Sequence, residues 1–476
     1  MRLKQVISAW AMSLLLAFAL AHAGAAELAA SIDALLADPA LKHGIQGVVI
    51  ESLASGRVLY ERNRDLVFIP ASNFKLVVSA ASLDRLGPDC TFATQVYMSG
   101  RLDAHGVLDG DLILVGGGDP VLSSDDLRAL AAEVKGKGIR RITGQIIADE
   151  SRFDDVRLGW GWSWDDEPFY YSAQISALSV DRNVVGVYVY PGAKEGDPVR
   201  IGLRPPSGYF RIESTARTGA PKSENTIYVD RERGKNLIRI SGSMPIDFKT
   251  TKATELITME NPALYAATLF KDMLGRSGVR AAGSTVIGKK PDGAELLAEH
   301  KSPPLSKILA LLNKPSDNLI AEMLLKNLGA EIKGKGTAAA GEEVELDFLK
   351  TAGADMSAIS INDASGLSRL DYISPGNLVA LLKHMWRHKH SRVFLDSLSI
   401  AGVDGTLRSR MKGTPAQNNV RAKDGYISRV STLSGYVTTR SGEPLVFSIM
   451  MNGHLCPASD AKRVQNSICV LLAELP

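Results

Sequence analysis

The sequence predicts an α+β protein in which an antiparallel sheet flanked by helices is interrupted by a β-rich insertion. Strand-like runs lie near both ends of the chain, at residues 46–69 and 430–452. Short strands and Gly-rich turns dominate between them at first, and helical periodicity then returns. A chain of 476 residues with 45% hydrophobic content also exceeds the usual size of one domain. We therefore expect one α+β domain built from residues 26–95 and 255–476, with an inserted β-rich part at residues 96–254.

The first residues have the layout of a secretory signal peptide. Arg2 and Lys4 precede the apolar stretch AWAMSLLLAFAL, and small residues around Ala23 offer cleavage sites. The apolar stretch is too short to span a membrane comfortably, although an uncleaved membrane anchor is the alternative. The pattern predicts a signal peptide at residues 1–25 and a mature protein outside the cytoplasm.

The charge balance and the cysteines exclude several classes of protein. The formal net charge of +3 falls by two, to +1, once Arg2 and Lys4 are removed, so no overall basic field attracts nucleic acid. Three cysteines do not make a disulfide framework, but Cys456 and Cys469 are close enough in sequence to pair in an oxidising compartment. Cys90 would then stay unpaired. No Cys-x-x-Cys spacing is present, so the sequence predicts neither a zinc site nor another cofactor.

The first elements in chain order are a hairpin and a helix. Residues 46–69 contain two β-rich runs separated by Ser55-Gly56, which is typical of a hairpin turn. The stretch ASNFKLVVSAASLDRL is helix-compatible, with one apolar face and Ser72 at its start. Within the insertion, SSDDLRALAAEVKGKG predicts one clear helix. GGGDP at residues 116–120 is better explained as a strand-end turn than as a phosphate loop, because no Lys-Ser/Thr pair follows it.

The C-terminal half predicts helices, then strands, then a closing helix. Helical periodicity runs from NPALYAATLFKDMLGRSG onward, and STLSGYVTTR and PLVFSIMMN then predict two strands joined at Ser441-Gly442. A helix from about residue 458 closes the chain. His384 and His388 have helical metal-ligand spacing, but no acidic residue lies between them and the flanking Lys and Arg repel a cation. We interpret their helix face as basic and solvated.

A Ser-x-x-Lys sequence supplies the first candidate for chemistry. Ser72 and Lys75 are three residues apart at a helix start and therefore share a face. A serine nucleophile needs an adjacent base, and a desolvated lysine can lose its proton and serve as one. The same spacing recurs at Ser409 and Ser459, which we interpret as solvated positions. The motif alone is therefore weak.

Two later motifs give the first one its specificity. Ser316-Asp317-Asn318 lies just before a helix, where a plain N-cap is the simpler explanation. Lys423-Asp424-Gly425 opens a predicted strand. A helix-start Ser-x-x-Lys, a helix-edge Ser-Asp-Asn and a Lys-x-Gly before a strand follow the order found in β-lactamases and penicillin-binding proteins.

The chain resembles the class C low-molecular-mass penicillin-binding proteins, the D-alanyl-D-alanine carboxypeptidase and DD-endopeptidase family. The stretches that carry the resemblance extend over nearly the whole mature chain: PASNFKL, GGGDPVL, GWGWSWDDEP, SALSVDRNVV, KPSDNLIAEMLL, DASGLSRLDYISP and IAGVDGTLRSRM. It implies a serine β-lactamase/DD-peptidase-like transpeptidase domain with accessory domains inserted between its first two motifs. It also implies a periplasmic enzyme.

The resemblance assigns a role to each motif residue. Ser72 is expected to attack the carbonyl of a D-Ala-D-Ala or D-Ala-diaminopimelate bond and to form an acyl-enzyme, with Lys75 accepting its proton. Ser316 and Lys423 are expected to relay a proton to the leaving amine, and Asn318 to hold the amide side of the substrate.

The same resemblance implies how substrate is held. The oxyanion hole is expected to use the backbone N–H groups of Ser72 and Tyr426, each such donor typically contributing about 10²–10³ in rate. In relatives that bind diaminopimelate, an acidic residue of the insertion and an arginine hold the zwitterionic end. The positions expected to bind substrate are Trp162, Asp165, Arg369, Asp424, Gly425 and Tyr426. A structural corner is the alternative for the Trp-rich stretch.

Asp424 departs from the family pattern, which has Thr or Ser between Lys and Gly. That hydroxyl binds the substrate's terminal carboxylate, and a second carboxylate about 4 Å away costs roughly 4 kcal/mol at an effective dielectric near 20. Three compensations stay open: protonation of Asp424 by burial, neutralisation by Arg421 or Arg429, or substrate binding through other groups. Lys423 is also expected to be weakened as a proton relay if it pairs with Asp424.

The expected partners are peptidoglycan stem peptides, with β-lactam antibiotics as covalent inhibitors and no nucleic acid. A peptidoglycan-binding pseudoenzyme with poor turnover is the main alternative. A β-lactamase is disfavoured, because no Glu-x-x-x-Asn deacylation loop of the class A kind is present. The sequence leaves the oligomeric state open.

Overall fold

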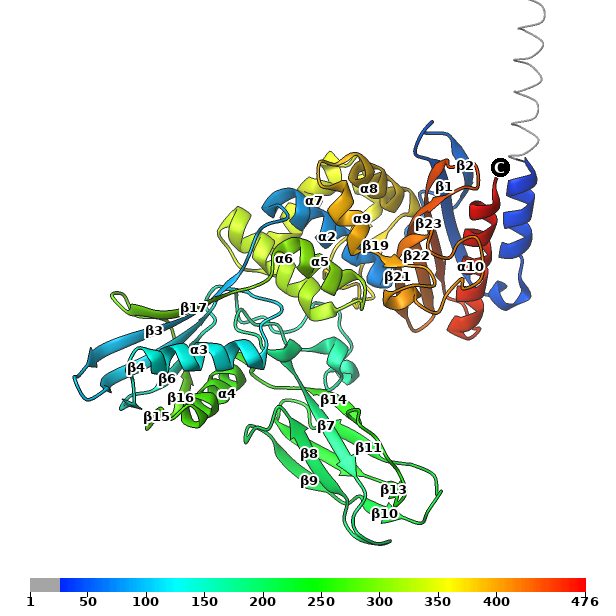
Figure 1. The fold of residues 1–476 in the computed structure, drawn as a ribbon. Coiled ribbons are helices and arrows are strands. Elements are labelled where there is room, and N and C mark those ends of the chain that lie inside the picture. Colours follow the sequence, from blue (N-terminus) through cyan, green and yellow to red (C-terminus); the bar gives the residue numbers. More distant parts are fainter. Residues whose placement is uncertain (1–25) are drawn as a thin grey trace, which may run out of the picture.

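A six-stranded antiparallel sheet, flanked by helices, lies toward one end of the computed structural model, which describes residues 26–476 (Figure 1). We call it the central sheet of the α+β domain. The predicted signal peptide at residues 1–25 lies outside the described residues. The strand order is β2-β1-β23-β22-β21-β20, so the first strand pairs with the last. The bounds are β1 Ile45–Ser52, β2 Val58–Arg62, β20 Ser399–Ile400, β21 Arg421–Ile427, β22 Val430–Thr438 and β23 Pro444–Asn452.

Helices cover both faces of this sheet. Val48 and Ile50 of β1 face a core made with the helix over residues 26–36 and with α10 (Ala458–Glu474), whereas Val49 faces the other helices. Burial on both faces explains why β1 is apolar throughout instead of alternating with polar residues. The helices of the second face are α2 Lys75–Leu86, α5 Leu305–Asn313, α6 Asn318–Lys333, α7 Ala338–Thr351, α8 Pro375–Arg387 and α9 Ser391–Ser397.

Several sequence predictions are confirmed at the two ends of the chain. The hairpin predicted at Ser55-Gly56 joins β1 to β2 as an antiparallel pair. The turn predicted at Ser441-Gly442 joins β22 to β23, and Gly442 has the positive φ of 92° that this turn uses. The closing helix α10 begins at Ala458, as expected.

The inserted part contains a seven-stranded sheet covered by two helices. Its strands are β3 Ala93–Leu102, β4 Val107–Gly116, β5 Arg141–Ile142, β6 Ile146–Asp149, β15 Arg280–Ala281, β16 Thr285–Ile287 and β17 Glu295–Lys301. Its helices are α3 Ser124–Gly136, which begins with a Ser123/Asp126 capping box, and α4 Pro262–Arg276.

The expected boundary at residue 255 is wrong. Helix α4 packs on α3 and β6, and β17 pairs with β3, so the insertion continues to residue 301. The chain returns to the central sheet only at Leu305, where α5 begins. The sequence misled because the periodicity of α4 shows that one face is buried but not which sheet it is buried against.

Three smaller sheets form a second lobe, which extends away from the central sheet in Figure 1. They confirm that the middle of the insertion is rich in short strands. Their bounds are β7 Val184–Tyr190, β8 Arg200–Arg204, β9 Arg211–Ser214, β10 Arg217–Gly219, β11 Tyr228–Arg231, β12 Leu237–Ser241, β13 Ser243–Pro245 and β14 Glu255–Thr258. The short pair β18 Ile359–Ser360 and β19 Tyr372–Ile373 lies outside the insertion.

The GGGDP stretch is a strand-end turn, as predicted. It follows β4, and Gly118 has a φ of 80°. The buried Asn327 of α6 donates from Nδ2 to the Gly118 carbonyl over 2.8 Å and accepts from Arg152 Nε at 3.1 Å. This turn therefore ties the insertion to the helices behind the central sheet.

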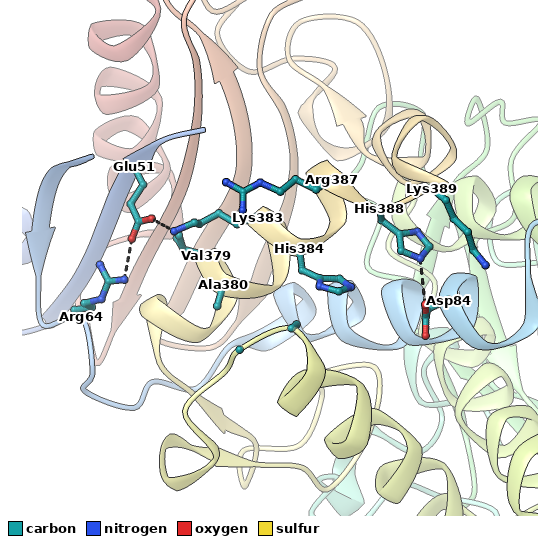
Figure 2. A pocket seen from close by; sticks show the side chains of 12 residues that line it. Glu51, Arg64, Asp84, Val379, Ala380, Lys383, His384, Arg387, His388 and Lys389 are labelled. Atoms are coloured by element: carbon teal, nitrogen blue, oxygen red, sulfur yellow. Dashed lines mark hydrogen bonds and ion pairs between the residues drawn. The ribbon is translucent and has the colours of Figure 1, made fainter. Parts of the chain in front are cut away.

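A cavity of about 700 Å³ lies between β1 and α8 (Figure 2). The buried Glu51 lies between Arg64 and Lys383 and pairs with both. His388 bonds Asp84 of α2 at 3.1 Å, and no cluster of potential metal ligands occurs among residues 26–476. In the same range, no helix is both long and apolar enough to cross a membrane.

We expect Asn327→Ala to lower the free energy of unfolding by about 1–3 kcal/mol, because it leaves the Gly118 carbonyl buried without its donor. Urea unfolding followed by circular dichroism measures this change. Asn419→Ala is the matched control, since Asn419 also bonds a main-chain carbonyl, at 2.7 Å, but at an exposed site. Equal losses in the two variants would show that the turn does not stabilise the fold.

Candidate active site

A cavity of about 900 Å³ lies where the edge of β21, the start of α6 and the insertion meet. It brings together motifs that are hundreds of residues apart in the sequence. Of the residues predicted from the sequence, those that line it are Ser72, Asp165, Ser316, Asn318, Arg369, Asp424 and Tyr426. Lys75 and Lys423 are completely buried behind this wall.

Ser72 lies in a single turn of 3₁₀-helix, Ala71–Phe74, directly before α2. Ala71 has a φ of 46°, which is uncommon for a residue with a side chain and common at functional sites. A Cβ atom at Gly366 would lie 1.9 Å from the Ala71 carbonyl oxygen, so only glycine fits there. This close approach brings the loop that carries Ser365 up against the serine.

The Lys75 side chain is fixed in the site by three hydrogen-bond contacts. Its Nζ contacts Ser72 Oγ at 2.9 Å, Asn318 Oδ1 at 2.6 Å and the Ser365 carbonyl at 2.6 Å. Burial, and secondarily the positive charge of Lys423, lower the pKa of Lys75 to about 7. Near neutral pH, a large share of this amine is therefore unprotonated and can accept the Ser72 proton.

The Asn318 side chain binds Lys75 and does not present a free amide group to the cavity. While Oδ1 accepts from Lys75, Nδ2 donates to the Tyr171 carbonyl of the insertion at 2.7 Å. Ser316, at a φ of 65°, lines the cavity before the helix. Asp317 is the N-cap of α6, which was the simpler explanation of the Ser316-Asp317-Asn318 motif. Its carboxylate also pairs with Arg182 Nε at 2.8 Å.

Lys423 and Asp424 form an ion pair. Lys423 Nζ donates to the Asp424 carbonyl at 2.6 Å and to its Oδ1 at 3.3 Å. Burial lowers the pKa of Lys423, although the charge of Asp424 opposes that change. The second lysine of the site is therefore bound to its neighbour.

Two of the compensations considered for Asp424 are wrong. Burial alone would raise its pKa, but Lys423, the Thr406 hydroxyl at 2.5 Å and Arg410 together hold the pKa below its usual range. The carboxyl is therefore ionised at neutral pH and not protonated. The expected arginines bind elsewhere: Arg421 NH1 pairs with Asp396 at 3.3 Å, and Arg429 NH1 donates to the Leu455 carbonyl at 3.1 Å. Lys423 and Arg410 supply the positive charge instead.

Gly425 lets the edge of β21 approach the serine. A Cβ atom there would lie 2.9 Å from the Ser72 backbone nitrogen and 2.7 Å from the Pro70 carbonyl oxygen. Thr432 fixes the same region, because its hydroxyl donates to the Pro70 carbonyl at 2.7 Å. Tyr426, next along the strand, is half-exposed in the cavity.

The predicted substrate-binding residues of the insertion have different surroundings. Asp165 is exposed and lines the cavity, and Arg369 lines it while donating from NH2 to the Ser428 carbonyl at 2.9 Å. Trp162 does not line the cavity: its indole N–H donates to Asp363 at 2.8 Å. The indole of Trp162 is half-buried, and this bond anchors the insertion against the loop behind Ser72.

Sequence reasoning missed Glu322 and Asp363, which position the base. The buried Glu322 accepts from the Ala364 and Ser365 amides at 3.1 and 2.8 Å, and so fixes the carbonyl that Lys75 uses. Burial and then the charge of Asp363 raise the pKa of Glu322 to about 8. A signal was present, because Glu322 lies four residues after Asn318 and therefore on the same helix face.

The cysteines take no part in the site. Cys90, Cys456 and Cys469 are all free thiols, so the pairing of Cys456 with Cys469 that the sequence left open is absent. Burial raises the pKa of Cys469 to about 12.

Comparisons with known proteins point to one family. The model of the D-Ala-D-Ala carboxypeptidase 3 (S13) family matches residues 28–475. The chain is 43% identical over 462 residues to a D-alanyl-D-alanine carboxypeptidase of Actinomadura sp. (strain R39), a match that covers 94% of this chain and 85% of the relative.

Solved structures give the same result for the fold. The crystal structure of penicillin binding protein 4 (dacB) from Haemophilus influenzae matches with a TM-score of 0.82 and 25% identity, covering 93% of this chain and 99% of that one. The same protein complexed with a novel β-lactam matches with a TM-score of 0.76 and 23% identity, over 93% and 99% of the two chains.

We expect Lys75 to titrate near pH 7 in NMR spectra of protein with ¹³C-labelled lysine, several units below an exposed lysine. Lys423→Met should raise this pKa, because it removes a positive charge that disfavours the Lys75 ammonium. Lys462→Met, which removes another cavity lysine, serves as the control and should leave it unchanged. Titration of Lys75 near pH 10 would contradict its assignment as a base.

Proposed function

The chain belongs to the D-Ala-D-Ala carboxypeptidase 3 (S13) family of serine peptidases, and we propose that it cleaves peptidoglycan stem peptides through an acyl-enzyme on Ser72. The observation that carries this proposal is the Lys75 amine, buried and 2.9 Å from Ser72 Oγ. A hydroxyl beside an amine with a pKa of about 7 is the arrangement that a serine nucleophile needs at neutral pH.

The proposed reaction begins with proton transfer from Ser72 to Lys75. Ser72 Oγ attacks the scissile carbonyl, and the backbone N–H groups of Ser72 and Tyr426 stabilise the oxyanion that forms. The C–N bond then breaks as the proton on Lys75 is relayed through Ser316 and Lys423 to the leaving amine, which leaves Lys75 free to accept a proton from the water that follows. Water hydrolyses the ester that remains and restores Ser72.

Within this mechanism, Asn318 acts chiefly through Lys75. Both ends of its amide already have partners, at 2.6 and 2.7 Å, so it orients the base and links it to the insertion. This differs from the role the family resemblance gave it, which was contact with the substrate amide.

We propose that Asp165 and Arg369 bind the acyl part of the substrate. They carry opposite charges and line the same cavity as Ser72, which suits a zwitterionic group such as the free end of diaminopimelate. Trp162 supports this site from behind through Asp363. The relative from Haemophilus influenzae binds a β-lactam, and we propose that β-lactams acylate Ser72 in this chain.

The pseudoenzyme alternative has no support, because the nucleophile and its base are in reach of one another and the relatives are named as carboxypeptidases. We further propose that the protein acts in the periplasm. The secretory layout of residues 1–25 and the extracytoplasmic location of peptidoglycan support this location.

Ser72→Ala should abolish both labelling by a fluorescent penicillin and release of D-Ala from a pentapeptide, because it removes the hydroxyl that lies 2.9 Å from Lys75 Nζ. In-gel fluorescence and mass spectrometry of tryptic peptides measure the adduct. Ser409→Ala, which disrupts the solvated Ser-x-x-Lys, is the control and should label fully. A penicilloyl adduct on any residue other than Ser72 would overturn the mechanism.

The acylation rate should rise with pH and level off above about pH 7, because the reactive form has Lys75 unprotonated and its pKa is about 7. Stopped-flow measurement of penicillin acylation between pH 5 and 9 tests this. Lys75→Arg should slow acylation by at least about 10³, because a guanidinium stays protonated throughout that range. A flat profile would show that Lys75 is not the base.

A further inference from the structure

The two ends of the cavity differ in chemistry. Arg369 donates to the Ser428 carbonyl just beyond the C-terminal end of β21. Asp424 lies toward the other end of the same strand edge, where its Oδ1 accepts from Thr406. Ser72 lies between them, because Gly425 packs on its backbone.

The leaving residue belongs at the Asp424 end. Ser316 and Lys423, the proposed proton donors to the leaving amine, lie on this side of Ser72. Thr406 is on the same side, since its backbone N–H donates to the Lys314 carbonyl just before the Ser316 motif, at 3.0 Å. A substrate with its acyl part at Arg369 therefore has its leaving residue beside Asp424 and Thr406.

The hydrogen-bond donors at this end of the cavity, Thr406 and Lys423, already bond Asp424. The single hydroxyl proton of Thr406 is donated to Asp424 Oδ1, at 2.5 Å. Lys423 gives two of its donors to the carbonyl and the carboxylate of Asp424. A carboxylate on the leaving residue would have to compete with Asp424 for these donors.

Electrostatic repulsion by Asp424 also disfavours a carboxylate on the leaving residue. The Asp424 side chain lines the cavity, while the positive groups that balance it, Lys423 and Arg410, lie buried behind it. Of these three charged groups, Asp424 is therefore the one that lines the cavity. Like charges brought together in such a site oppose binding, and this repulsion discriminates between ligands.

We propose that Asp424 selects the leaving residue: it disfavours peptides whose leaving residue carries a free carboxylate and favours those in which that carboxyl is a neutral carboxamide. The inference rests on the proposed function and specifies its substrate class as stem peptides amidated next to the scissile bond. Cleavage of free D-Ala-D-Ala ends continues, but at a rate that Asp424 limits.

The test compares two peptides that differ only in their terminal charge, acyl-D-Ala-D-Ala and acyl-D-Ala-D-Ala carboxamide. The ratio of their kcat/KM values, carboxylate over carboxamide, should be below one in the wild type. Asp424→Asn keeps an oxygen for Thr406 and Lys423 but removes the charge. It should raise the ratio at least about tenfold, through faster cleavage of the carboxylate peptide.

Asp424→Thr should also raise the ratio. This second neutral variant keeps the test valid if Asp424→Asn does not fold. Asp396→Asn is the matched control, since it removes a carboxylate that pairs with Arg421 of β21 outside the cavity, and it should leave the ratio unchanged. Penicillin acylation of Ser72, measured in every variant, reports separately on the proposed mechanism.

A ratio that is equal in the wild type and both Asp424 variants, with acylation of Ser72 intact, would overturn the inference and leave the proposed function standing. Failure of the wild type to acylate would overturn both. A higher ratio in both variants, without a matching change for the carboxamide peptide, supports the assignment of Asp424 to leaving-group selection.

Discussion

The site depends on keeping one amine out of water. Lys75 is completely buried, and its pKa of about 7, which suits it to the proposed role of base, depends on that burial. Its three acceptors come from three separate segments of the chain: Ser72 next to it, Asn318 on α6 and Ser365 on the following loop. The packing of α2 on α6 and the tight turn at Gly366 are therefore requirements of the chemistry as well as of the fold.

The insertion contributes to this arrangement and is more than an appended unit. The Tyr171 carbonyl holds the far end of the Asn318 amide, and the Trp162 indole bonds Asp363, which orders the loop that carries Ser365. The inserted part thus buttresses the base from one side while it forms a wall of the cavity on the other. A change deep in the insertion can alter the reactivity of the serine without touching it.

The motif residues could be predicted because each depends on short-range spacing. Ser72 and Lys75 share a helix face, and the strand that opens at Lys423 follows from its β-rich pattern. The contacts of Thr406 with Asp424, and the use of the Tyr171 carbonyl, could not be predicted, since they join distant segments or involve main-chain atoms that carry no sequence signal. The misplaced boundary before α4 has the same origin: periodicity reports burial but not the partner.

The pairing of the first strand with the last also has a consequence for how the chain matures. β1 lies between β2 and β23, so the six-stranded sheet cannot close until the C-terminal strands have been synthesised. Such contacts between distant segments form slowly and carry a large loop-closure entropy. Until then Lys423, on β21, is not in place beside Lys75. A chain whose synthesis has not yet reached β23 therefore has an incomplete site, although Ser72 and Lys75 are already present in it.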